Sequence, residues 1–197
     1  MHRLSTTFVL GYHGCDRDVG DSLIDGTPFE ESRNEYDWLG WGIYFWEANP
    51  IRGLEFANEW KERNGKIKEP YVVGAIIDLG YCLDLTTSAG VRAIRGAHKD
   101  FIAYSNKAGS PIPKNSGNDE DKLLRKLDCA VVNHLHHVLQ VGRQKPFDSV
   151  KGVFIEGGRM YDDSGFYNKT HIQICVRNPE CIKGVFRVPD HDLKSGI

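Results

Sequence analysis

The sequence contains no long apolar run. No stretch approaches the ~20 consecutive apolar residues that a membrane-spanning helix needs. Only a short apolar stretch precedes Gly11, so we expect no secretory signal. There is also little net charge, because 25 Lys and Arg oppose 27 Asp and Glu. This balance excludes the bulk basic charge that draws a protein onto nucleic acid or an anionic membrane. We therefore expect a cytoplasmic protein with no membrane partner, whose contact with any nucleic acid would be carried by a local patch.

Cysteine is scarce and unpatterned. An odd, scattered set without a Cys-x-x-Cys pair is typical of reduced thiols, and it excludes a zinc ribbon. His134 and His137 share one face of a predicted helix, but no third ligand accompanies them at a diagnostic spacing. We therefore predict no metal. The five cysteines are Cys15, Cys82, Cys129, Cys175 and Cys181.

Glycine is the residue in excess, with 21 among 197 residues. This is about 11%, against a typical ~7%. Several of these glycines stand beside aromatic residues, which indicates that backbone geometry matters at a site. The length fits one domain, so we predict a single domain over residues 1–197.

The apolar patterning predicts an α+β fold. Strands are expected at 7–12, 41–46, 71–79, 150–155, 172–176 and 182–188, and helices at 50–64, from a cap at 86–88, and at 123–141. Strands and helices do not alternate strictly, which favours a mainly antiparallel sheet with helices packed on it. Residues 15–38 are polar and are predicted to form a long loop with one helical turn, long enough to act as a lid.

Three segments carry candidate chemistry. The first is Tyr12-His13-Gly14 at the end of a predicted strand, where an imidazole meets a residue without a side chain. The second is Gly40-Trp41-Gly42-Ile43-Tyr44-Phe45, an aromatic strand with two glycines. The third is the strand 171–176, in which Gln173 alternates with apolar residues after a glycine-rich loop at 157–170. Taken singly, the first two segments are more often a structural histidine and a buried aromatic strand, and Gln173 is also consistent with a solvated sheet face.

The order of the three segments resembles the diphtheria-toxin-like and poly(ADP-ribose) polymerase-like ADP-ribosyltransferases. That family carries a His-Tyr-Glu triad, with His in a His-Gly, Tyr in a Gly-x-Gly-Ile-Tyr-Phe and Glu on a late strand followed by Pro-x-x-Ile. Here the late strand continues into Val176-Arg177-Asn178-Pro179-Glu180-Cys181-Ile182. The resemblance covers the first sixty and the last fifty residues or so. It implies a split, mainly antiparallel two-sheet fold with packed helices, and a helical segment of about 84–145 inserted between the motif regions.

The resemblance also implies roles for individual residues, with NAD as substrate. His13 would hydrogen-bond the ribose on the adenosine side of NAD, and Gly14 would bind the nicotinamide carboxamide through its backbone. Tyr44 would stack on the nicotinamide ring. Phe56, on the following predicted helix, is the candidate for a second stacking ring. Apart from the resemblance, Trp38 or Trp41 is a candidate to line the nicotinamide end or to stack an acceptor base, with packing in the core as the alternative.

The third motif departs from the family pattern, because Gln173 stands where the family has Glu. An amide can hydrogen-bond a ribose hydroxyl, but it cannot act as a carboxylate base. This counts against chain elongation and leaves transfer of a single ADP-ribose open. Glu156 stands at the end of the preceding predicted strand, and we consider it as a candidate auxiliary carboxylate.

We therefore expect a mono-ADP-ribosyltransferase that cleaves NAD to nicotinamide and modifies a protein or nucleic-acid acceptor. Such an enzyme suits a bacterial or phage toxin or defence effector, for which an antitoxin or inhibitor protein would be a partner. The alternatives are a catalytically inactive NAD or ADP-ribose binding module and an NAD glycohydrolase. An RNA 2′-phosphotransferase relative is disfavoured, because residues 8–14 and 39–46 contain no arginine.

Overall fold

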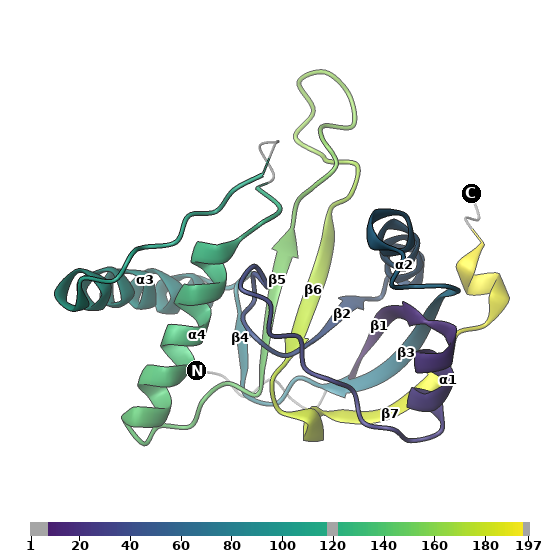
Figure 1. Ribbon diagram of the computed structural model, residues 1–197, viewed down its shortest axis with the longest axis horizontal. Coiled ribbons are helices and arrows are strands. Elements are labelled where there is room, and N and C mark those ends of the chain that lie inside the picture. Colours follow the sequence, from purple (N-terminus) through teal and green to yellow (C-terminus); the bar gives the residue numbers. More distant parts are fainter. Residues whose placement is uncertain (1–7, 118–121, 195–197) are drawn as a thin grey trace.

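The structure is a computed structural model that describes residues 8–117 and 122–194 (Figure 1). Its strands are β1 (Phe8–Asp16), β2 (Ile43–Glu47), β3 (Pro70–Asp78), β4 (Cys82–Asp84), β5 (Ser149–Phe154), β6 (His171–Val176) and β7 (Ile182–Arg187). Its helices are α1 (Arg17–Ile24), α2 (Pro50–Asn64), α3 (Ser88–Ala108) and α4 (Lys126–Val141), with short 3-10 turns at Pro179–Cys181 and Asp190–Leu193.

All seven strands belong to one sheet, in the order β4-β5-β6-β2-β1-β3-β7. Every neighbouring pair is antiparallel except β4 and β5, which are parallel. The predicted α+β class and mainly antiparallel sheet are therefore confirmed, but the prediction of two sheets is wrong. The physical reason is that β1 and β2 still pair over two residues, which joins the two halves into one hydrogen-bonded sheet.

Local sequence signals position the helices well. In α2, the Asn49 side chain accepts a hydrogen bond from the Arg52 backbone N–H, Pro50 occupies the first turn, and Gly65 ends the helix with a φ of 63°. Thr87 caps α3 in the same way through the backbone N–H of Gly90. The predicted helices around 50–64 and 123–141 are thus confirmed within a few residues.

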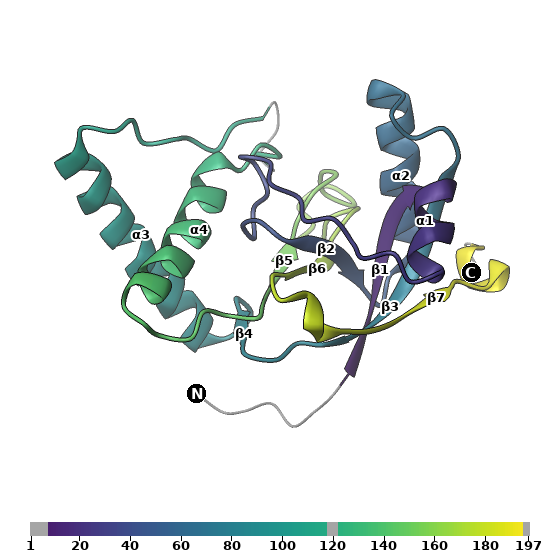
Figure 2. The same cartoon turned by 60° about the horizontal axis from the view of Figure 1, so that its bottom comes forward.

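The predicted loop over residues 15–38 is only partly correct. Its first residues complete β1, and residues 17–24 form α1, an eight-residue helix capped by Asp16. Leu23 of α1 is buried against Tyr71 and Val73 of β3, and this tertiary contact stabilises a helix whose polar sequence alone predicted a loop. The remaining segment, residues 25–42, runs across the sheet from α1 towards α4 (Figure 2). Its Phe29 packs against His13 and Phe45.

Helices cover both faces of the sheet unequally. Gly20 of α1 lies against Tyr71 and Val73, whereas Gly53 of α2 lies against Val72, and neighbouring residues of a strand point to opposite faces. The helices α1 and α2 therefore cover opposite faces of the β1–β3 half. Val132 of α4 packs with residues of β4, β5 and β6 on the same face as α2. Between α2 and α4, the loop that precedes β2 covers this same face of β2 and β6.

No helix within the described ranges is both long and apolar enough to cross a membrane.

Candidate functional site

The junction between β1 and β2, which we call the seam, is short. Only Gly11 with Glu47 and Tyr12 with Trp46 pair across it, whereas β1 pairs with β3 along its whole length. After Tyr12, β1 therefore has no strand partner on the β2 side within the described residues. The seam opens at the point where the first sequence motif lies.

Gly14 presents its peptide edge to this open part of the seam. Successive residues of an antiparallel strand direct their backbone groups alternately to the two neighbouring strands. The Ala48 N–H donates to the Leu10 carbonyl from the β2 side, so Tyr12 and Gly14 face the same way. Gly14 lies beyond the last β1–β2 pair. Its glycine identity has a separate cause, because a Cβ here would lie 2.1 Å from the Gly53 carbonyl oxygen of α2.

His13 bridges the seam. Its Nδ1 atom lies 2.9 Å from the carbonyl oxygen of Tyr44. A carbonyl only accepts, so Nδ1 carries a proton and donates it. Burial lowers the pKa of His13, although the Tyr44 hydrogen bond acts in the opposite direction. The ring is therefore neutral at pH 7, and its Nε2 lone pair makes no hydrogen bond to another described residue. His13 can accept a hydrogen bond from a ligand hydroxyl.

Tyr44 fixes the loop that leads into β2. Its hydroxyl accepts a hydrogen bond from the Leu39 N–H at 2.9 Å and donates one to the Gly40 carbonyl at 2.8 Å. Burial raises the pKa of Tyr44 well above its ordinary value, so the phenol stays protonated. The ring lies on the opposite face from His13, which instead contacts the neighbouring Phe45. The structure thus joins His13 and Tyr44 through a backbone carbonyl rather than side chain to side chain.

Gln173 lies on the same face of the sheet as Tyr44, and it pairs with Trp46 across the β2–β6 ladder. The Trp38 indole Nε1–H donates to its Oε1 atom at 2.6 Å. An indole nitrogen only donates, so the amide orientation is fixed with its oxygen towards Trp38. The Nε2 group makes no hydrogen bond to another described residue. Gln173 therefore offers a ligand a donor, where a glutamate would offer an acceptor.

The two auxiliary aromatic candidates lie elsewhere. Phe56 of α2 packs on Trp46 with ring centroids 4.8 Å apart, and it has no ring contact with Tyr44. Trp41 points away from the seam into a cavity beside α4, and its indole is 43% exposed. The structure therefore does not bring Phe56 or Trp41 onto the Tyr44 ring, and their predicted part in binding NAD stays a prediction.

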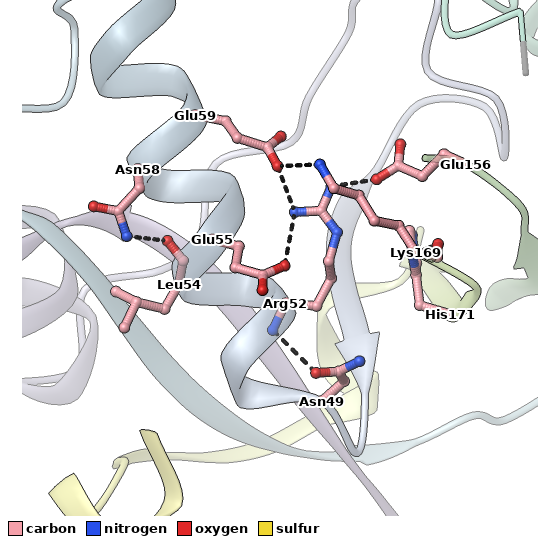
Figure 3. A network of polar contacts seen from close by, with 9 residues as sticks. All are labelled: Asn49, Arg52, Leu54, Glu55, Asn58, Glu59, Glu156, Lys169 and His171. Atoms are coloured by element: carbon pink, nitrogen blue, oxygen red, sulfur yellow. Dashed lines mark hydrogen bonds and ion pairs between the residues drawn. The ribbon is translucent and has the colours of Figure 1, made fainter. Parts of the chain in front are cut away.

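Glu156 belongs to a network of ion pairs beside the seam (Figure 3). Its carboxylate bonds the Nη2 group of Arg52, a residue of α2 that is only 6% exposed. The other terminal nitrogen of Arg52, Nη1, lies 3.3 Å from the Glu59 carboxylate. The same carboxylate also binds Lys169 at 2.8 Å. Glu156 is thus turned towards Arg52, and its charge is compensated there rather than held free.

The contacts of several polar groups next to Gln173 become apparent only in the structure. Trp38 orients the amide, and Arg52 holds the carboxylates. The Trp46 Nε1 and His171 Nε2 atoms are buried with no hydrogen-bond partner among the described residues. The sequence did indicate His171, because it stands two residues before Gln173 and therefore shares its face of the strand. No sequence signal connects Trp38 with a strand 135 residues later.

Comparisons with known proteins give one relative. The chain is 27% identical over 211 residues to a Methanocaldococcus jannaschii protein described as "Uncharacterized protein MJ0359", with 94% of this chain and 88% of that protein aligned. No protein-family model matches the chain. No solved structure matches it either. The relative extends over nearly the whole chain, but its description assigns no activity.

Proposed function

We propose that the chain is a cytoplasmic mono-ADP-ribosyltransferase that binds NAD at the seam, on an ADP-ribosyltransferase-like fold. The observation that carries this proposal is the early end of the β1–β2 ladder. Because of it, the Gly14 peptide edge is unpaired beside a neutral His13. The three sequence motifs also meet around β2, because His13 bonds the Tyr44 carbonyl and the strand that carries Gln173 pairs with β2.

The exposed groups suit the parts of NAD. The Gly14 N–H and C=O can bind the oxygen and amino group of the nicotinamide carboxamide as a matched pair. His13 Nε2 can accept from a hydroxyl of the adenosine ribose. Gln173 Nε2 can donate to an oxygen of the nicotinamide ribose. These contacts orient the dinucleotide across the seam, and orientation is a large part of what a transferase supplies.

The reaction consists of one bond broken and one bond formed. The bond from C1′ of the ribose to the nicotinamide nitrogen breaks, and nicotinamide leaves with the electron pair as a neutral molecule. An acceptor oxygen or nitrogen then bonds to C1′ and loses its proton to solvent. The developing charge on the ribose is stabilised by electrostatics, and Gln173 supplies a neutral dipole there rather than a carboxylate. We therefore expect slow transfer of one ADP-ribose and no chain elongation.

A second candidate, a catalytically inactive NAD or ADP-ribose binding module, is favoured by one observation. Neither Gln173 nor Glu156 supplies a free negative charge. Gln173 is a neutral amide whose Oε1 accepts from Trp38, and the Glu156 carboxylate is paired with Arg52. Such a site retains hydrogen bonds for binding but offers the ribose no free carboxylate from either residue.

The thiols support the proposed compartment. All five cysteines are unpaired, which supports a reducing environment such as the cytoplasm.

The experiment uses NAD labelled separately in its nicotinamide and adenosine parts, incubated with the protein and a cell lysate. We expect nicotinamide release together with adenosine label on macromolecules. His13→Ala should abolish both, whereas His134→Ala, which alters an imidazole bound to Asp100 away from the seam, should not. Release without macromolecular label would indicate an NAD glycohydrolase. NAD binding without release would establish the binding module, and neither binding nor release would refute the NAD site.

A further inference from the structure

A cavity lies outside the seam and has a volume of about 600 Å³. It is bounded by α4, by the segment 31–41 before β2 and by the segment that follows β6. His13, Tyr44 and Gln173 do not line it. The volume lies within the usual range of small-molecule sites.

Arg177 supplies this cavity with a cation that has no ion-pair partner among the described residues. Its Nη1 group donates to the Trp41 carbonyl at 2.7 Å and to Asn133 Oδ1 at 3.1 Å, and both acceptors are neutral. No carboxylate of the described residues forms an ion pair with it, and its Nε and Nη2 groups bind no other described residue. Burial lowers the pKa of Arg177 without neutralising it, although the charge of Glu31 acts to raise that pKa. A half-buried guanidinium with open donors is suited to a phosphate group.

The other charged side chains of the cavity largely cancel one another. Arg33 pairs with Glu31 at 3.1 Å, and Lys145 pairs with Asp148 at 2.8 Å. The local excess is therefore the single positive charge of Arg177. An anionic ligand would be attracted to Arg177 rather than to a diffuse basic surface.

His136 adds an unused polar atom to the same cavity. The residue is 2% exposed, and its Nδ1 lies 2.8 Å from the Val132 carbonyl. Burial and then the charge of Arg177 lower the pKa of His136 to about 4, although the carbonyls of Val132 and Phe147 act in the opposite direction. The ring is therefore neutral at pH 7. Its Nε2 atom is buried without a hydrogen-bond partner among the described residues, and an atom in that state indicates a ligand or a bound water.

Trp41 supplies a flat apolar surface beside these polar groups. Its backbone is held on both sides, because its N–H donates to Asn133 Oδ1 at 3.1 Å and its carbonyl accepts from Arg177. The indole nevertheless stays 43% exposed and lines the cavity. A large aromatic side chain with a fixed backbone and an open ring is suited to stacking with a nucleobase.

We propose that this cavity binds a nucleoside monophosphate, with the phosphate on Arg177, the base on Trp41 and a ribose hydroxyl donating to His136 Nε2. The site is separate from the seam and does not depend on NAD cleavage. Its ligand combines the three kinds of group that the cavity offers, a cation, an aromatic face and a buried acceptor.

The test is calorimetric titration of the full chain with AMP, adenosine and inorganic phosphate. We expect AMP to bind more tightly than either adenosine or phosphate. Trp41→Ala and Arg177→Gln should each weaken AMP binding about tenfold, in line with the ~1–3 kcal/mol that base stacking contributes. Trp41→Phe should restore most of the loss. Because Trp41 is 43% exposed and is held through its backbone hydrogen bonds, we expect its variants to keep the fold even if Arg177→Gln does not.

Matched controls keep the proposal falsifiable. Arg143→Gln removes an exposed positive charge near the end of α4 outside the cavity lining, and it should leave AMP binding unchanged. The proposal is overturned if AMP does not bind, if phosphate binds as tightly as AMP, or if Trp41→Ala leaves AMP binding unchanged.

Discussion

Arg52→Met should destabilise the protein strongly. The Arg52 side chain is 7% exposed and that of Glu156 is 12% exposed, so their ion pair is screened little by water. Methionine preserves the apolar stem beside Trp46 but leaves the Glu156 and Glu59 carboxylates without their shared cation. Removing one partner of a buried ion pair typically costs about 3–5 kcal/mol of unfolding free energy. We expect a loss in this range.

The assay is urea unfolding at pH 7, with Lys169→Met as the matched control. Lys169 binds the same Glu59 at 2.8 Å, but its side chain is 41% exposed. Exposed ion pairs contribute about 0–1 kcal/mol, so the control should lose little. Adding Glu156→Gln to Arg52→Met should recover part of the loss, because it removes the uncompensated charge. If Arg52→Met cost no more than Lys169→Met, the assignment of a stabilising buried network would be refuted.

Three further perturbations test other parts of the structure. Gly14→Ala would place a Cβ 2.1 Å from the Gly53 carbonyl, so thermal unfolding should reveal a loss of about 1–3 kcal/mol, and an unchanged melting temperature would contradict the close packing of α2. The pKa of His136 is lowered to about 4, so its neutral form stabilises the fold above the unfolded pKa of about 6.5, and that stability is lost as the pH falls. The urea concentration at the unfolding midpoint should therefore decrease as the pH is lowered from 7 to 5, and it should decrease less in His136→Phe. An equal decrease in the two proteins would exclude His136 as a cause. Trp38→Phe removes the hydrogen bond to Gln173 Oε1, typically worth about 1 kcal/mol of stability, and no longer fixes the amide orientation, so nicotinamide release should slow several-fold. An unchanged rate would exclude Trp38 as a positioning residue.

The local elements follow from the sequence because their causes are local. The Asn49 cap, the Pro50 start and the Gly65 stop of α2 all involve residues within one helical turn of the ends. The β-branched run of β3 likewise predicts a buried strand. In contrast, α1 depends on Leu23 packing against Tyr71 and Val73, and β4 depends on pairing with β5, more than sixty residues later. Neither contact is visible in the neighbouring sequence.

The candidate site divides in the same way. The sequence by itself determined the three motifs and the absence of a carboxylate at Gln173, because residue identity alone decides which protons a side chain can carry. Only the tertiary structure decided that the β1–β2 ladder ends after Tyr12 and that Arg52 pairs with Glu156. It also decided that Trp38 occupies the oxygen of the Gln173 amide and leaves the amino group available as a donor. The register of strands and the direction of side chains are set by contacts between segments far apart in the chain. Such contacts exist only once the whole sheet has formed.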